Sequence, residues 1–266
     1  MRRIAHLSDL HFGREDPAIA AGLADDLAKQ AVDLILVSGD LTQRARPAQF
    51  RSARRYLDSL GIPWLAVPGN HDIPLFDLGR RLVAPFGRYQ SLICGDLEPA
   101  FMDDELAVLG LNTALPWVWK GGLVRRSAFP RLRAWSGEAG GRARIVFAHH
   151  PFTRHAASRS DLVRGWRQAI RAMEMAGVDL VLTGHQHRFG HSESRIIPVG
   201  GPHRLVVVRA STSISHRRHR GEPNSYSLLD LDDRSLRVAS RNWSGTRFDA
   251  GTTHSYRRIP YEPHRA

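Results

Sequence analysis

Five short polar motifs, each directly after a short apolar run, constrain the fold of this chain more than any other feature. In order, they are Asp9-Leu10-His11, Gly39-Asp40, Gly69-Asn70-His71-Asp72, His149-His150-Pro151 and Gly184-His185-Gln186-His187. The runs before them have the length and composition of buried strands. Open α/β sheets bind their ligands beyond the carboxyl ends of strands, so we expect the five motifs to meet at one site.

The residue types in these motifs bind metal through nitrogen or oxygen. A carboxylate can bridge two cations, whereas a neutral histidine offers one nitrogen and an asparagine one carbonyl oxygen. This mixed set suits Mn, Fe, Zn, Co or Ni better than Ca. Asp9 and His11 are two residues apart, which on a regular strand places both side chains on one side. Any single motif could be only a turn, but together they predict two adjacent divalent cations, which can bind phosphate and supply hydroxide.

Strands and helices alternate along the first part of the chain. Helices are expected to begin at Asp16-Pro17 and at Pro47, and strands are expected over residues 4–7, 34–38, 64–67, 106–111, 145–148 and 180–183. After residue 183 only strands follow, at 205–208, 225–231 and 236–243. The pattern predicts an α/β sandwich with a largely parallel first sheet.

The domain organisation expected from this pattern is simple. Residues 1–266 form a single domain, and residues 204–258 supply the β-rich C-terminal part of the second sheet. Residues 73–104 and 116–141 are expected to be inserts that form a rim or cap over the site. The aromatic side chains there either stack on a substrate base or pack in the core; they are Phe76, Phe86, Trp117 and Trp119.

The amino-acid composition limits which kinds of molecule this chain is expected to bind. The net charge of +12 favours anionic partners. However, nearly all of this charge is arginine scattered along the chain, which genome composition would also explain, and nucleic acid is therefore not favoured. The single cysteine, Cys94, excludes an intramolecular disulfide. No apolar stretch approaches the roughly 20 residues of a membrane span, and no signal-peptide segment follows Met1, so a cytoplasmic protein is expected.

The ordered motif set resembles the calcineurin-like metallophosphoesterase superfamily. The matching motifs extend from residue 9 to residue 187, about two thirds of the chain. The segment 210–226 is also similar to the branch that holds bacterial cyclic-nucleotide and glycerophosphodiester phosphodiesterases. The resemblance implies an α/β fold, namely a four-layer α/β/β/α sandwich of two mixed sheets. It also implies a dinuclear metal site at the carboxyl ends of the strands.

The resemblance further implies a role for each matching residue. Asp9, His11 and His187 would hold one metal, Asn70, His149 and His185 the other, and Asp40 would bridge them. His149 is preferred as the ligand over His150, which then plays a supporting part. His71 would face the substrate phosphate and protonate the leaving oxygen. Asp72 either orients His71 or caps the turn. Arg217 and Arg220 either grip a phosphate or belong to a solvated loop.

The activity implied is metal-dependent hydrolysis of small phosphodiesters such as 3',5'-cyclic nucleotides, by attack of a bridging hydroxide on phosphorus. A lipid-pathway nucleotide-sugar diphosphate hydrolase is an alternative, although those relatives carry Gly-Asn-Arg-Asp in place of Gly-Asn-His-Asp. A nuclease is another, but its coiled-coil insertion is absent. A scaffold that has lost its chemistry is disfavoured, because no predicted ligand is missing. Dimers are frequent among the relatives, so a homodimer is an expectation without an interface signal.

Overall fold

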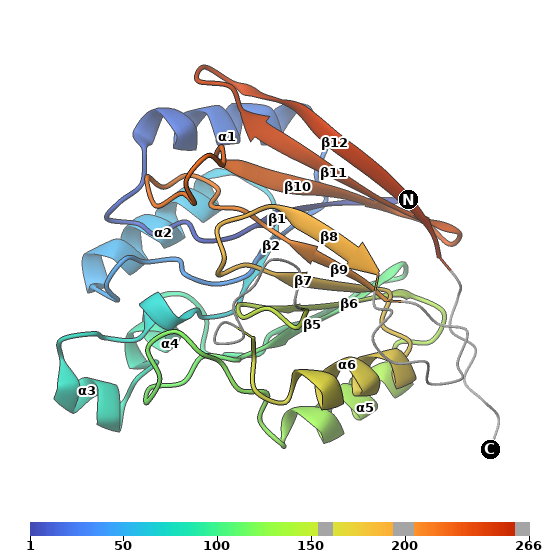
Figure 1. Cartoon of the computed structure of the whole chain (residues 1–266), viewed down its shortest axis with the longest axis horizontal. Coiled ribbons are helices and arrows are strands. Elements are labelled where there is room, and N and C mark those ends of the chain that lie inside the picture. Colours follow the sequence, from blue (N-terminus) through green and yellow to red (C-terminus); the bar gives the residue numbers. More distant parts are fainter. Residues whose placement is uncertain (154–161, 194–204, 259–266) are drawn as a thin grey trace.

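Two six-stranded sheets packed face to face, with helices on their outer sides, make up the molecule (Figure 1). The computed structural model describes residues 1–153, 162–193 and 205–258. The order of layers is helices, sheet, sheet, helices. The predicted four-layer α/β/β/α sandwich is therefore confirmed.

The first sheet combines the N-terminal strands with the C-terminal ones, in the order β12-β11-β10-β1-β2-β3. Strands β1 (Arg2–Leu7), β2 (Leu34–Val37) and β3 (Trp64–Ala66) are parallel. Strand β10 (Ser225–Leu231) pairs antiparallel with β1 and continues through β11 (Ser235–Trp243) to β12 (Phe248–Arg257). The sheet is therefore mixed, as the resemblance implied, and not largely parallel as the strand pattern predicted, because three of its strands pair antiparallel.

The second sheet has the order β4-β5-β6-β7-β9-β8. Its four central strands are parallel: β5 (Leu106–Leu111), β6 (Ala143–Ala148), β7 (Leu180–Thr183) and β9 (Val206–Arg209). The edge strands β4 (Ala100–Met102) and β8 (Gly190–Glu193) run antiparallel to their neighbours. Every residue of β5, β6 and β7 is buried, as expected for strands covered on both faces.

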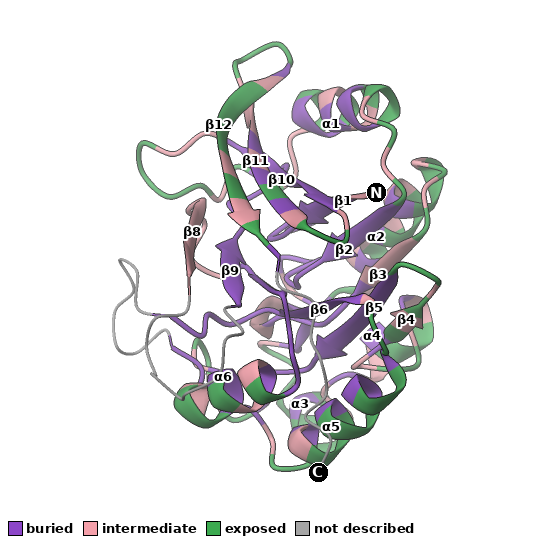
Figure 2. Cartoon of the chain, turned by 90° about the vertical axis from the view of Figure 1, so that its right-hand side faces the viewer, coloured by how far each residue is buried: buried purple, intermediate pink, exposed green. Residues whose placement is uncertain are grey.

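Helices cover the outer face of each sheet. Helix α1 (Pro17–Lys29) begins where the Asp16 carboxylate accepts hydrogen bonds from the amides of Ala18 and Ile19. Helix α2 (Pro47–Ser59) joins it on the first sheet. Helices α5 (Ala128–Glu138) and α6 (Trp166–Met175) cover the second sheet. Figure 2 shows the consequence: central strands such as β6 and β9 are buried and the helices expose one side, while the edge strand β12 is largely exposed.

Three apolar clusters hold these layers together. The first lies between α1, α2 and the first sheet, and includes Leu23, Leu27 and Phe50. The second lies between α5, α6 and the second sheet. The third fills the space between the two sheets, with Ile4 and Phe147 among its members. Burial of apolar area at roughly 25 cal/mol per Å² makes such clusters the main source of stability.

Two expectations about the later chain need correction. Residues 204–258 do not all belong to the second sheet, because only β9 does so and β10 to β12 extend the first sheet beside β1. The insert 116–141 is only partly a rim, because its second half is α5, whose Leu132 and Trp135 are buried against the second sheet.

The insert 73–104 is likewise divided. Helix α3 (Leu78–Val83) projects from the edge of the molecule (Figure 1). Helix α4 (Gly87–Leu92) packs inward, because Tyr89 is buried and its hydroxyl donates to the carbonyl of Ala66. Strand β4 ends the insert as an edge strand. Among the described residues, no helix is long and apolar enough to cross a membrane.

Candidate metal centre

All five motifs lie beyond the carboxyl ends of strands, as predicted. Asp9 and His11 follow β1, Asp40 follows β2, and the turn of 3-10 helix Asn70–Asp72 follows β3. His149 follows β6, and His185 and His187 follow β7. Three groups bring ligand atoms within 4.8 Å of one another: Asp9, His11 and His187; Asp9, Asp40 and His149; and His149, His150 and His185.

The backbone of these motifs adopts an uncommon conformation. Among the described residues, seven that are not glycine have a positive φ, and five of them are predicted ligands: Asp9 (54°), His11 (48°), Asp40 (54°), His185 (72°) and His187 (53°). Left-handed backbone costs of order 1–3 kcal/mol per residue and concentrates at functional sites. The convergence of Asp9 and His11 therefore comes from this turn after β1 ends, and not from alternation along a strand as we expected.

Two motif glycines are required by close packing. A Cβ atom on Gly184 would overlap Ser8 Oγ and lie 2.7 Å from Asp9 Oδ2. A Cβ atom on Gly69 would overlap the carboxylate and amide of Asp40. Glycine at these positions lets the loops after β3 and β7 approach the carboxylates closely.

The first group is built around Asp9. Its Oδ1 atom lies 3.1 Å from His187 Nε2 and 3.6 Å from His11 Nε2. The Nε2 atoms of His11 and His187 are 3.3 Å apart. Asp9 Oδ1 is buried without a hydrogen-bond partner, whereas Oδ2 accepts from Ser8 Oγ and from the amide of His185. One carboxylate oxygen thus faces two ring nitrogens, which is the arrangement of a cation site.

The second group is built around His149. Its Nδ1 atom is 2.9 Å from the carbonyl oxygen of Ser38, which can only accept, so Nδ1 carries the proton and Nε2 faces the site. Nε2 lies 3.1 Å from Asn70 Oδ1 and 3.2 Å from His185 Nδ1. Fixing the tautomer through the other ring nitrogen is typical of metal-binding histidines.

Asp40 lies between the two groups. Its Oδ2 atom is 3.5 Å from His149 Nε2 and 3.8 Å from His11 Nε2. Its Oδ1 atom accepts from the amide of His71 at 2.8 Å, which orients the carboxylate. A carboxylate placed in this way can contribute to both cation sites.

The electrostatics of the cluster suit cation binding. Burial lowers the pKa of His11 to about 3 and that of His185 to about 3, so both rings are neutral at pH 7 and have a free lone pair. Burial alone would raise the pKa of Asp9, but His187, with His149 and His11, holds it well below its ordinary value. Neutral imidazoles beside ionised carboxylates form a donor set that fits divalent transition metals.

His150 has a different environment from His149. Its Nδ1 atom is 2.9 Å from Thr113 Oγ1, and its ring centroid is 4.7 Å from that of His185. Burial, followed by the charges of His185 and His149, lowers its pKa well below the ordinary value. His149 faces Asn70, Asp40 and His185. His150 also lies beside His185 but makes no contact of this kind with Asn70 or Asp40.

His71 is held by both ring nitrogens. Its Nδ1 atom lies 3.0 Å from the carbonyl oxygen of Gln43, so Nδ1 carries a proton. Its Nε2 atom lies 2.7 Å from NH1 of Arg217. Burial lowers the pKa of His71, and Arg217 lowers it further, while Asp40 and the Gln43 carbonyl oppose this.

Asp72 contacts backbone rather than His71. Its carboxylate accepts from the amides of Leu41, Thr42 and Gly69 and from the Thr42 hydroxyl. These bonds join the loop after β2 to the loop after β3. Burial and the charge of Asp40 raise the pKa of Asp72 to about 7, against the effect of those donors. The contacts are those of a turn cap.

A cavity of ≈ 370 Å³ opens over the cluster, and four basic side chains line it: Lys120, Arg188, Arg217 and Arg218. Arg217 and Arg220 were expected either to grip a phosphate or to belong to a solvated loop; Arg217 lines the cavity and Arg220 does not. Lys120, Arg188 and Arg218 were missed, because only the fold brings them beside the motifs. Arg218 lies in the basic run 217–220, which was the one available signal.

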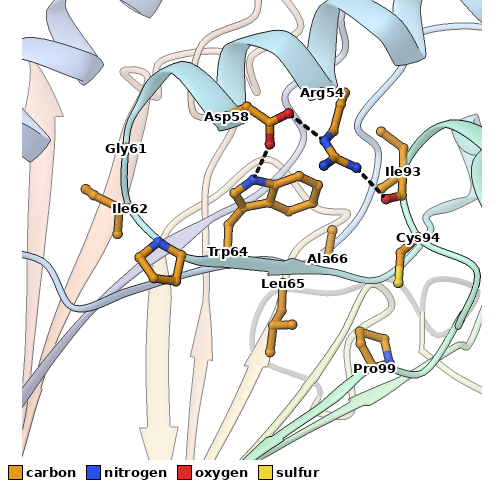
Figure 3. Close-up of a pocket in the computed structure, with 11 residues that line it drawn as sticks. Arg54, Asp58, Gly61, Ile62, Trp64, Leu65, Ala66, Ile93, Cys94 and Pro99 are labelled. Carbon is orange, nitrogen blue, oxygen red and sulfur yellow. Dashed lines mark hydrogen bonds and ion pairs between the residues drawn. The ribbon is translucent and has the colours of Figure 1, made fainter.

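A larger cavity, of ≈ 550 Å³, lies beside strand β3 and is lined by none of the motif residues (Figure 3). Its polar groups pair with one another. Asp58 accepts from Arg54 at 2.6 Å and from the Trp64 indole at 3.0 Å. The described chain places no cluster of reactive groups there, so the chemistry is expected over the metal centre.

Residues 2–189 match the family described as calcineurin-like phosphoesterase, and the chain belongs to this family. It is 27% identical over 213 residues to a glycerophosphodiester phosphodiesterase, GpdQ, of Enterobacter lignolyticus, covering 72% of this chain and 73% of the relative. It is 29% identical over 198 residues to a probable cyclic nucleotide phosphodiesterase of Synechococcus, covering 70% and 73%. The resemblance to this bacterial branch is confirmed.

Solved structures agree on the fold. A dimetal phosphatase from Danio rerio superposes with a TM-score of 0.70 at 13% identity, covering 97% of this chain and 99% of that one. A purple acid phosphatase from yellow lupin gives 0.71 at 12% identity, covering 96% and 53%. At these identities the likeness concerns the fold alone.

Proposed function

We propose that this chain is a two-metal phosphodiesterase that acts on small diesters such as 3',5'-cyclic nucleotides. The observation that carries the proposal is the convergence of the seven predicted ligand side chains, with the Asp40 carboxylate between His11 and His149. The two bacterial relatives, which are named as phosphodiesterases, support the diester class.

The residues present fit two divalent cations. Asp9, His11 and His187 would hold one, and Asn70, His149 and His185 the other, with Asp40 shared. When bound, such cations neutralise phosphate charge and supply a hydroxide near neutral pH. Left-handed backbone at five of these residues, the hydrogen bond that Asp40 Oδ1 accepts and the one that His149 Nδ1 donates would hold donor atoms in place before the cations bind.

His71 is proposed as the group that transfers a proton to the leaving oxygen. The Gln43 carbonyl fixes its ring by accepting from Nδ1, which leaves Nε2 directed at the cavity side, where Arg217 lies. While Nε2 accepts from Arg217 it carries no proton. Once Arg217 turns to a phosphate oxygen, Nε2 can take up a proton from solvent and pass it to the leaving oxygen. Arg217 is proposed to bind a phosphate oxygen, and Asp72 to hold the loop of His71 in position.

The cavity favours a small substrate. Its volume of ≈ 370 Å³ is at the lower end of the range for small-molecule sites, about 300–1,000 Å³. Four cationic side chains around it favour an anionic ester. A 90-residue similarity to the DNA repair protein Mre11 of Saccharolobus solfataricus covers only 23% of that protein, so it adds little to the nuclease alternative.

Steady-state hydrolysis with added Mn²⁺ tests the proposal. The panel contains bis(p-nitrophenyl) phosphate, p-nitrophenyl phosphate, 3',5'-cyclic AMP, glycerophosphoethanolamine, a nucleoside diphosphate-linked lipid and single-stranded DNA. We expect the generic diester to exceed the monoester and a small diester to give the highest kcat/KM. The Asp40→Ala variant serves as the inactive control. A preference for the monoester, or for the lipid diphosphate or DNA over every small diester, would contradict the proposal.

A further inference from the structure

We propose that an exposed apolar rim beside the metal centre binds the surface of an anionic lipid bilayer. The rim consists of six side chains from two segments, around α3 and in the loop before α5: Phe76, Leu78, Leu82, Val83, Trp117 and Trp119. The proposed chemistry assigns no role to it.

The exposure of these side chains is unusual for this molecule. Among the described residues, nine large apolar side chains are exposed, and six of them belong to the rim. Val83 is 87% exposed, Phe76 78% and Trp117 67%. Of the four aromatic residues that we expected to stack on a base or to fill the core, only Phe86 is buried. Concentrated apolar exposure of this kind marks an interaction surface.

The two segments meet next to the metal-site cavity. The guanidinium carbon of Arg81 lies 5.3 Å from the ring centroid of Trp119, and its NH1 atom donates to the carbonyl of Pro74. The carbonyl of Trp119 accepts from Asn70 Nδ2 at 3.1 Å, and the next residue, Lys120, lines the metal-site cavity. Figure 1 shows α3 at the edge of the molecule, beyond both sheets.

The charge of the rim identifies the partner. Arg80 and Lys120 are exposed and close to rim residues in the sequence, and Arg126, later in the loop before α5, is exposed as well. The acidic group in these segments is Asp77, which is already paired with Arg80 and Arg88. Surfaces that bind the interface of anionic bilayers combine tryptophan, phenylalanine and leucine with basic residues, as this rim does. The apolar groups enter the headgroup region, and the cations meet lipid phosphates.

A second copy of the chain fits this surface poorly. In a twofold contact the same patch meets itself, so the basic side chains of one rim would face those of the other. Like charges across an interface oppose association. The bilayer, which is negative, has the complementary charge.

Vesicle co-sedimentation tests the proposal with the full chain. We expect binding to vesicles of equal parts phosphatidylglycerol and phosphatidylcholine, weaker binding at high salt, and little binding to phosphatidylcholine alone. The triple variant Phe76→Ser, Val83→Ser, Trp117→Ser should bind these vesicles at least about tenfold more weakly, because it removes apolar side chains that would enter the bilayer. The three positions are exposed, so the substitutions should cost the fold little stability. Met175→Ser, at a 66% exposed apolar residue on α6, should bind like wild type.

The alternatives give different results. Equal vesicle binding by the triple variant and wild type would overturn the proposal, because the net charge of the chain alone would then account for the binding. Absence of binding to the anionic vesicles would also overturn it. Loss of self-association in the triple variant, measured by sedimentation velocity without lipid, would assign the rim to a protein contact instead. Hydrolysis of glycerophosphoethanolamine, a soluble diester without a base, should be unchanged in the triple variant, because none of the three residues lines the metal-site cavity. This test is therefore separate from the proposed function.

Discussion

Arg217 and His71, 146 positions apart in sequence, meet where Arg217 NH1 donates to His71 Nε2 across 2.7 Å. The contact places a permanent cation against the ring nitrogen that faces the cavity. Because Arg217 also lines the cavity, it can leave this contact to bind a substrate oxygen, which frees His71 Nε2 for the leaving oxygen. This relationship makes the two residues one functional unit, with effects that should not add.

Replacing Arg217 should therefore weaken substrate binding and turnover together. For Arg217→Ala we expect kcat/KM for a small diester to fall by about 10²-fold, in the range seen when one preorganised donor is removed. Arg217→Lys should recover part of the loss, because it keeps the charge but not the planar fork. Kinetics of both variants measure this, and metal content serves as the control. Unchanged kcat/KM would remove Arg217 from the site.

His71→Ala should lower kcat by about 10²–10⁴-fold, the usual effect of losing a general acid or base. The loss should be large for a diester with a poor leaving group and small for bis(p-nitrophenyl) phosphate, whose leaving oxygen needs no proton. The double variant with Arg217→Ala should be little worse than the poorer single variant. Equal losses on both kinds of leaving group would exclude proton transfer by His71.

Asp72→Ala should destabilise the protein. Its carboxylate accepts from three amides and one hydroxyl, and all lie in the buried join between two loops. An unpaired buried donor costs about 1–3 kcal/mol, and these costs do not simply add. We therefore expect the free energy of unfolding to fall by about 3 kcal/mol. Urea denaturation of the metal-free protein measures it. Wild-type stability combined with loss of activity would instead indicate a direct role in catalysis.

His6 should make stability depend on pH. Burial lowers its pKa to about 3, while its ring contacts Ser38 Oγ at 2.9 Å. The unfolded chain therefore takes up a proton on this ring that the folded chain does not. The stability from His6 is complete above its unfolded pKa of about 6.5 and declines as pH falls toward 3.

The matched variant is His6→Gln, which keeps a side chain able to contact Ser38. Between pH 7.5 and pH 5.0, metal-free wild type should lose about 2 kcal/mol more stability than His6→Gln. Parallel urea titrations at the two pH values give the difference. The same pH dependence in both proteins would show that His6 is not the cause.

Much of the site was predictable, because strand ends are encoded locally. Apolar runs such as 34–37 are unmistakable as buried strands, and the polar residues after them must emerge at a sheet edge. How these residues converge was less accessible. The left-handed backbone at Asp9 and His187 appears in residues that are not glycine, so no sequence signal marks it.

The remaining differences reflect contacts between distant parts of the chain. Strand β10 pairs with β1 rather than with β9, which precedes it, because sheet membership is decided by nonlocal pairing. Trp135 could be recognised as apolar but not as part of a layer over the second sheet. Lys120 and Arg188 reach the cavity from loops whose paths only the fold determines. The metal identities and a homodimer stay predictions.

Metal content is the most direct test of the whole account. Purified wild-type protein reconstituted with Mn²⁺ and dialysed should carry about two ions per chain by elemental analysis, since the seven proposed ligands lie around two positions on either side of Asp40. Asp40→Ala should carry fewer than about one, because its carboxylate lies between both groups, at 3.5 Å from His149 Nε2 and 3.8 Å from His11 Nε2. Two ions retained by Asp40→Ala, or none bound by wild type, would contradict the account.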